Sequence, residues 1–275
     1  MTMTKLKKSI LPRFTRALAV VLAIALAVGN ASAQAGSKKL DKSEVLQRAN
    51  DAYYVLQTQG LKTFQCNIQP NWKQMFEGIR KNTVPDDDPL LLSLIHVQFS
   101  VTVDDQGRAK VAPILPTGGN LAPTANRAVD DFRVMFESFF QFWSLLAFKS
   151  VFPSASEIGS NFYEENDGYH FGEQQEGGYS EYVLTKALVL TTMKMVTRAG
   201  TVVVHPRFTK TSKGLLLASM NVDLNNGTHK IIFEIQDQEV SGFHLPSRLV
   251  SHMSMPTQEV RPVESSFNNF SLTLR

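Results

Sequence analysis

The chain has 275 residues, 43% of them apolar, and its 28 basic and 25 acidic residues give a formal net charge of +3. Five basic and no acidic residues precede Gly36, so residues 36–275 hold 23 basic and 25 acidic residues, a formal net charge of −2. This balance excludes the strongly basic surface typical of nucleic-acid-binding proteins, and we expect no nucleic-acid partner. Cys66 is the single cysteine, which excludes an intramolecular disulfide, and we expect its thiol to be a buried apolar group.

Residues 1–35 have the pattern of a cleaved secretory signal peptide. Five basic residues come first, an apolar run follows at 17–28, and small residues end the segment at Ala31, Ala33 and Ala35. This order suits a positive end held at the inner membrane face, a short apolar helix and a signal-peptidase site. The apolar run is too short to cross about 30 Å of hydrocarbon. We therefore expect a periplasmic protein with no transmembrane segment in its mature chain, and an extracellular location is the alternative.

The first part of the mature chain is predicted to hold one helix and two strands. Asp41 and Glu44 form a capping-box pattern. An apolar stripe at helical spacing then extends towards a stop at Gly60, and it consists of Val45, Ala49, Ala52 and Leu56. Residues 64–68 and 97–103 alternate between apolar and polar side chains, which is typical of half-buried strands.

Two polar segments in this region are predicted to be loops. Asp86, Asp87 and Asp88 lie between two prolines, without the alternating ligands, central glycine and distal glutamate of an EF-hand calcium loop. Residues 117–120, Thr-Gly-Gly-Asn, are not followed by the Gly-Lys-Ser/Thr of a phosphate-binding loop. We expect a solvated loop at 86–88 and a plain turn at 117–120, with no metal and no cofactor.

The most apolar segment is a predicted helix at residues 132–152, ended by Pro153. It holds seven of the 18 phenylalanines and one of the two tryptophans. A helix that is apolar on nearly every side is normally buried on nearly every side. We expect this helix to line an apolar ligand cavity, and the alternative is that it only fills a sealed core. The predicted ligand-binding residues are Phe132, Phe136, Phe139, Phe140, Trp143 and Leu146.

From Phe162 onward the sequence predicts strands separated by turns. Asp167-Gly168 interrupts the first aromatic segments, an apolar run extends over 182–196, and Asn226-Gly227 is a strong hairpin signal. Six to nine strands at spacings of 8 to 15 residues favour an antiparallel meander. The predicted fold class is α+β and mainly antiparallel β: a half-open β-barrel with one or more apolar helices packed in or across it. Five methionines of this region either line a cavity or fill gaps: Met193, Met195, Met220, Met253 and Met255.

The sequence contains no convincing catalytic motif. The six histidines do not form the His-Glu-x-x-His pattern of a helical zinc site, and no Gly-x-Ser-x-Gly elbow occurs. His170 beside Glu173 is a candidate general base, although polar pairing on an exposed strand is the commoner role of such a pair. Several carboxylates surround two Gly-rich turns nearby, where open solvent disfavours the buried acid that glycoside hydrolysis needs. They are Glu164, Glu165, Asp167, Glu173 and Glu176.

Three segments carry a family resemblance. They are the opening helix at 45–54 with the residues that follow at 61–64, the Gly-Phe-His-Leu-Pro bend and its continuation at 242–249, and the closing segment at 267–272. These segments, and the order of helix, strands, apolar helix and β-meander, resemble the LolA-like family of periplasmic lipoprotein carriers. The resemblance implies an unclosed antiparallel barrel wrapped around a helical lid, with an apolar cavity between them. Residues 36–275 are then a single LolA-like half-barrel domain with an inserted middle region at about 70–160.

The predicted function is that of a cell-envelope protein that binds a lipid or a lipidated protein in an apolar cavity. The expected partners are a lipid or an acylated protein, with outer-membrane or other envelope proteins as further partners. Two alternatives come from other functional classes. One is an envelope scaffold or interaction protein with a filled core, and the other is a secreted hydrolase that uses His170 and nearby acids.

Overall fold

The computed structural model describes residues 41–275 except 81, 117–120, 159–160, 176–177, 199, 225–228, 256–257 and 260–261. The structural unit within this range is Lys42–Arg275. The predicted signal peptide at 1–35, the predicted turn at 117–120 and the Asn226-Gly227 hairpin signal lie outside the described residues.

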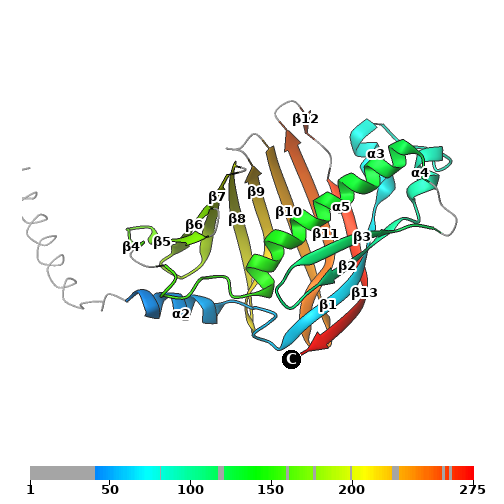
Figure 1. Cartoon of the computed structure of the whole chain (residues 1–275). Coiled ribbons are helices and arrows are strands. Elements are labelled where there is room, and N and C mark those ends of the chain that lie inside the picture. Colours follow the sequence, from blue (N-terminus) through cyan, green and yellow to red (C-terminus); the bar gives the residue numbers. More distant parts are fainter. Residues whose placement is uncertain are drawn as a thin grey trace, which may run out of the picture. The chain divides into compact units, whose positions relative to one another are not determined.

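One antiparallel sheet dominates this unit (Figure 1). Its strands are β1 (Leu61–Pro70), β2 (Gln98–Val103), β3 (Ala109–Ile114), β4 (Phe162–Glu164), β5 (Gly168–Gln175), β6 (Gly178–Thr185), β7 (Leu190–Thr197), β8 (Gly200–Thr211), β9 (Gly214–Leu224), β10 (His229–Val240), β11 (Phe243–Met255), β12 (Gln258–Glu259) and β13 (Val263–Leu274). Their order across the sheet is β3-β2-β1-β13-β11-β10-β9-β8-β7-β6-β5-β4, and β12 pairs with β11.

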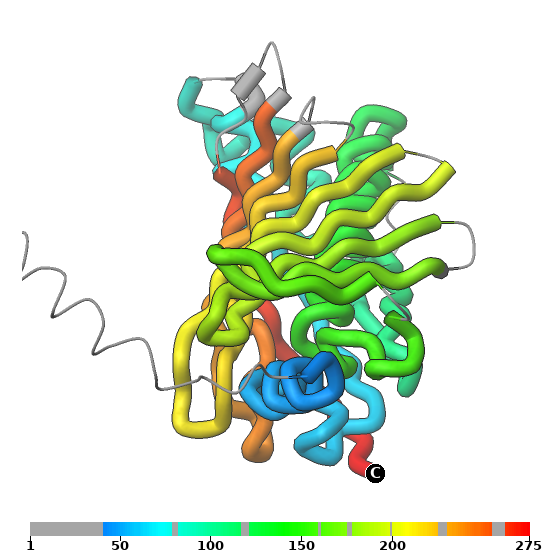
Figure 2. Tube along the Cα trace, turned by 90° about the vertical axis from the view of Figure 1, so that its left-hand side faces the viewer, coloured from blue at the N-terminus to red at the C-terminus, as the bar shows by residue number. Residues whose placement is uncertain are grey.

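The sheet is curved but not closed (Figure 2). Its two edges, β3 and β4, do not pair with each other in the described part of the chain. Burial alternates along the strands, as in β2, where Phe99, Val101 and Val103 are buried and the residues between them are more exposed. The predicted fold class, a mainly antiparallel half-open barrel with helices, is confirmed.

The first helix of the described residues, α2 (Lys42–Ala52), ends earlier than the predicted stop at Gly60. Tyr53 forms a parallel bridge with Leu215, and Tyr54 N donates to the Leu215 carbonyl at 2.9 Å. Leu56 N donates to Ala147 O at 3.0 Å. These backbone groups bond to distant segments instead of to the preceding helical turn, so tertiary contacts end the helix.

Two helices lie on either side of the loop predicted at 86–88, in a stretch where no helix was predicted from the sequence. They are α3 (Trp72–Arg80) and α4 (Pro89–Leu94). Asp88 is not simply solvated, because its carboxylate caps α4 and accepts hydrogen bonds from Leu90 N at 3.0 Å and Leu91 N at 3.1 Å. Pro89 follows at the first helical position, where proline is favoured. Asp86 and Asp87 are exposed, as expected.

The aromatic helix is longer at its start than predicted. It comprises α5 (Pro123–Trp143) and a π-helical turn, η1 (Ser144–Phe148), and therefore ends before Pro153. The Ala147 and Phe148 carbonyls at the end of η1 accept hydrogen bonds from Leu56 N and Gln57 N, each at 3.0 Å, which fixes this widened turn. Among the described helices, none combines the length and apolar character required to span a membrane.

Candidate functional site

α5 lies against the concave face of the sheet, and its aromatic side chains meet aromatic side chains of other elements (Figure 1). The ring pairs are Phe132–Trp72 of α3, Phe136–Phe99 of β2, Phe139–Phe233 of β10 and Phe140–Phe64 of β1, with centroid separations of 4.8, 5.2, 5.4 and 6.3 Å. Mixed edge-to-face and tilted ring contacts of this kind are typical of packed aromatic cores.

The structure brings the six predicted ligand-binding residues together, all of them buried. The exposed fractions are 6% for Phe132, 0% for Phe136, Phe139 and Phe140, 2% for Trp143 and 1% for Leu146. In this arrangement these side chains contact the sheet and one another. Substitutions here act first on the packing of α5 against the sheet.

The strand register identifies the other side chains on the same concave face. Phe233 contacts α5, so it marks this face. Ile231, two residues earlier on β10, points the same way and is paired with Val222 of β9 and Met253 of β11. The face continues across the next strands through the pairs Val222–Val204, Val204–Met193, Leu224–Val202 and Val202–Met195.

Part of this concave face remains half-exposed. We call it the upper apolar patch, and it consists of Met195 of β7, Val202 of β8, Leu224 of β9, Ile231 of β10 and Met253 of β11. Deeper on the same face, Met193, Val204 and Val222 are 3%, 0% and 0% exposed. The patch lies at the upper ends of these strands in Figure 1, where no described helix is drawn across β7, β8 or β9. Of the five methionines, two therefore belong to a partly exposed surface.

Met135 of α5 borders the patch. The Ser251 hydroxyl donates to Met135 Sδ at 3.4 Å, and Ser251 lies on β11 two residues before Met253. The Met135 side chain is half-buried. Methionine is flexible and polarizable, so it adapts to neighbours of different shape. Met135 therefore lies next to the position on β11 that precedes Met253 on the same face.

A separate cavity of about 440 Å³ lies beside the β2–β3 turn. Gln141 is one of its lining residues, and it faces away from Phe139 because residues two apart on a helix point to nearly opposite sides. The other lining residues are Gln106, Gly107, Arg108, Ala109, Glu137, Ser144, Leu145 and Lys149. Arg108 is bonded to Asp104 at 2.8 Å, and Glu137 is bonded to Arg133 at 2.9 Å. Both of these charges are therefore already engaged.

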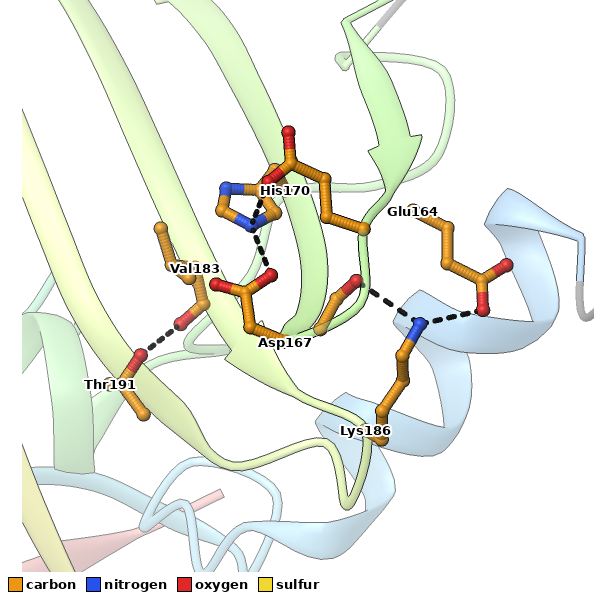
Figure 3. Close-up of polar contacts among 8 residues, drawn as sticks. Glu164, Asp167, His170, Val183, Lys186 and Thr191 are labelled. Carbon is orange, nitrogen blue, oxygen red and sulfur yellow. Dashed lines mark hydrogen bonds and ion pairs between the residues drawn. The ribbon is translucent and has the colours of Figure 1, made fainter. Parts of the chain in front are cut away.

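A polar cluster occupies the β4–β5 hairpin (Figure 3). His170 Nε2 lies 3.2 Å from Asp167 Oδ1 and 3.7 Å from Glu165 Oε2. The hydrogen bond from His170 holds the pKa of Asp167 below its ordinary value of 3.8. The His170 ring stacks on Tyr163, its cross-strand partner, with centroids 5.1 Å apart. One imidazole and two carboxylates thus converge on one point at the sheet edge.

The sequence suggested Glu173 as the partner of His170, but the structure gives His170 different partners. Residues 170 and 173 are an odd number apart on β5 and so face opposite sides of the sheet. Glu173 instead accepts a hydrogen bond from the Tyr182 hydroxyl at 3.3 Å. Glu164 pairs with a lysine at 2.7 Å, and Glu176 lies outside the described residues. The available sequence signal was the presence of three ligand-type residues within six positions around an Asp-Gly turn.

Cys66 is 2% exposed on β1, and burial raises the pKa of its thiol to about 12. The thiol therefore stays protonated near neutral pH and is a poor nucleophile. This confirms the expectation that Cys66 is a buried apolar group.

The chain was compared with protein families, curated proteins and solved structures, and no relative was found. No protein-family model, no curated protein and no solved structure matches the chain. The resemblance to LolA-like carriers therefore stays a prediction that depends on the three segments quoted above.

Proposed function

We propose that this protein binds the acyl chain of a lipid or a lipidated protein on the upper apolar patch, beside α5. The observation that carries the proposal is a set of five half-buried apolar side chains, one from each of five adjacent strands. The register pairs Met195 with Val202 and Val202 with Leu224 in one row, and it pairs Ile231 with Met253 two positions further along β10 and β11. Covering apolar surface gains roughly 25 cal/mol per Å². A flexible hydrocarbon chain is therefore a suitable occupant of this surface.

The opposite face of the same strands supports this assignment, because it carries charged and polar side chains that lie in pairs. Lys194 pairs with Glu181, Lys230 with Asp223, and His252 with Glu234. The contrast between the two faces follows the two-residue period of the strands. Contiguous apolar patches on protein surfaces commonly mark ligand, membrane or partner sites.

The proposal includes export to the cell envelope, with the periplasm as the working compartment. The basic, apolar and small-residue order of residues 1–35 supports it. The half-open sheet with a helix on its concave face supports it as well, because the LolA-like resemblance implies that arrangement for a carrier of acylated proteins. A lipid or lipidated protein is the kind of apolar cargo that needs a carrier across an aqueous compartment.

The test uses two adjacent residues of β10 that face opposite sides of the sheet. Ile231→Asp places a carboxylate in the patch, while Ile232→Asp places one on the charged face, opposite Asn221 and His252. Both positions are half-buried, so the pair is matched. With a dansyl-labelled fatty acid as the probe, Ile231→Asp should weaken binding about tenfold or more, since each 1.4 kcal/mol of lost contact is tenfold. Ile232→Asp should bind like the wild type.

Native mass spectrometry of protein taken from envelope extracts gives the independent readout. The wild type and Ile232→Asp should carry an added lipid or acyl mass, and Ile231→Asp should not. Absence of such a mass on the wild type, together with absence of probe binding, would contradict the proposal. Equal loss in both variants would also contradict it, because the effect would then not be specific to the concave face.

A second candidate function, partner recruitment, is favoured by exposed apolar side chains near the β3 edge. Leu92 and Ile95 are 55% and 43% exposed at α4, and Ile114 and Leu115 are 39% and 43% exposed at the end of β3. Leu115→Ser should then reduce recovery of a partner from envelope extract while leaving the probe affinity unchanged. An unchanged set of co-purified proteins would count against this second function.

A further inference from the structure

We propose that Glu165, Asp167 and His170 form a binding site for a divalent transition-metal ion of the Zn²⁺ type, independent of the acyl-binding patch. Each residue offers one ligand atom, and these atoms all lie within 4.8 Å of one another. The three residues belong to one hairpin, so a single turn of chain positions all the donors. Among the described residues, this cluster brings three ligand-type side chains to one point.

The spacing of the donor atoms fits a small cation. Zinc binds imidazole nitrogen and carboxylate oxygen at about 2.0–2.2 Å, so two ligand atoms of a tetrahedral site are about 3.4 Å apart. The His170 Nε2 atom lies 3.2 Å from one carboxylate oxygen and 3.7 Å from the other. These two contacts need adjustments of only a few tenths of an ångström. The two carboxylate oxygens lie within 4.8 Å of each other, so binding an ion also draws these two exposed side chains closer together.

The hairpin holds the imidazole and leaves the carboxylates accessible. His170 is stacked on Tyr163 with an interplanar angle of 10°, and its side chain is only 13% exposed. The Glu165 and Asp167 side chains are 57% and 66% exposed. Glu165 N donates to the Gly168 carbonyl at 2.9 Å, which closes the turn that contains Asp167. The site thus has one oriented nitrogen ligand and an open side through which an ion and water can enter.

The charge balance favours a divalent cation. Two carboxylates and one neutral imidazole together compensate a charge of +2. Lys186 lies on the same side of the hairpin, and its ammonium group donates to Glu164 at 2.7 Å and to the Gly168 carbonyl at 3.5 Å (Figure 3). A nitrogen ligand selects against Ca²⁺ and Mg²⁺, which take oxygen ligands, and suits Zn²⁺, Co²⁺ or Ni²⁺.

The same sheet supplies matched controls. His205 and His252 each lie 3.8 Å from one carboxylate, on Asp223 and Glu234 respectively. Those pairs resemble the His170–Asp167 contact but are not part of a described group of three ligand-type residues. Equal metal binding by these two-residue pairs would show that the third ligand, supplied by Glu165, does not contribute to binding.

The experiment titrates tag-free protein with Zn²⁺ by calorimetry and with Co²⁺ by visible absorption. We expect one ion per chain and a Co²⁺ spectrum typical of mixed nitrogen and oxygen ligation. His170→Ala should weaken Zn²⁺ binding more than about 100-fold, because changes to groups that merely support metal ligands already cost 10–100-fold. Glu165→Gln and Asp167→Asn, which keep the side-chain shape, should each weaken it at least tenfold, and His252→Ala should bind like the wild type.

Three results would overturn the site: no saturable one-to-one binding by the wild type, wild-type affinity in His170→Ala, or an equal loss in His252→Ala. Far-UV circular dichroism of each variant checks that the sheet is intact. The two isosteric carboxylate variants keep the test decisive if His170→Ala does not fold. Fatty-acid binding by His170→Ala should match the wild type, so failure of the metal site and failure of the acyl-binding patch are distinguishable.

Discussion

Phe139 of α5 and Phe233 of β10 meet edge to face, with ring centroids 5.4 Å apart and an interplanar angle of 60°. Both rings are 0% exposed. This contact joins the helix to the concave face of the sheet, two residues along β10 from Ile231 of the upper apolar patch.

Phe139→Ala should lower the free energy of unfolding by about 3–5 kcal/mol, because a buried ring is lost and a cavity remains. Urea denaturation measures this change. Val134→Ala is the control on the same helix: Val134 is 51% exposed, so its truncation should cost within about 0.5 kcal/mol. Equal costs for the two variants would contradict the burial of Phe139 between helix and sheet.

Tyr53→Phe should destabilise the fold by about 1–3 kcal/mol although it removes only one oxygen atom. The Tyr53 hydroxyl donates to Leu188 O at 3.2 Å and accepts from Leu190 N at 2.7 Å, at a site where Tyr53 is 4% exposed. Without the hydroxyl, both backbone groups of the β6–β7 turn lose this partner. Tyr163→Phe, at a position 48% exposed, is the control and should be nearly neutral in thermal unfolding.

Asp237→Asn should stabilise the protein at neutral pH. Burial raises the pKa of Asp237 from 3.8 to about 6, so the folded state holds this proton more tightly than the unfolded state. The resulting stabilisation is fully present below pH 3.8 and is lost as the pH rises through 6. The difference between the two pKa values corresponds to roughly 3 kcal/mol, which is the upper limit of the gain expected at pH 7.

Urea denaturation of the wild type and Asp237→Asn at pH 4 and pH 7 tests this dependence. The advantage of the variant should be large at pH 7 and small at pH 4. Glu239→Gln, an exposed position on the same strand, should show little difference at either pH. An advantage of Asp237→Asn that does not change with pH would contradict the raised pKa.

Helices and strands that are determined by short-range sequence patterns could be predicted from the sequence. The alternation of Phe99, Val101 and Val103 with polar residues predicts β2, and Asp41 with Glu44 predicts the start of α2. The Asp88-Pro89 pair also signals a helix start, and weighing it would have predicted α4. The end of α2 could not be predicted, because it depends on the bridge between Tyr53 and Leu215 of β9 and on the hydrogen bond from Tyr54 N to the Leu215 carbonyl.

The candidate sites show the same division. The stripe that includes Phe139 follows from helical spacing, so the side of the helix that faces the sheet was predictable. The upper apolar patch was not, because it is assembled from five strands whose register depends on bulges and turns along the whole meander. The partners of His170 depend in the same way on the folding of the β4–β5 hairpin, which turns Asp167 and Glu165 towards the ring.

β1 and β13 pair along their length in the interior of the sheet, from Leu61 opposite Leu274 to Pro70 opposite Ser265. β13 lies between β1 and β11 in the sheet, yet it is the last strand of the chain to be translated. During synthesis, β1, β2 and β3 are therefore complete long before β13 can join them to β11. Pairings between such distant segments form slowly. Any chaperone or export machinery that receives the nascent chain therefore binds it before β1 and β13 have paired.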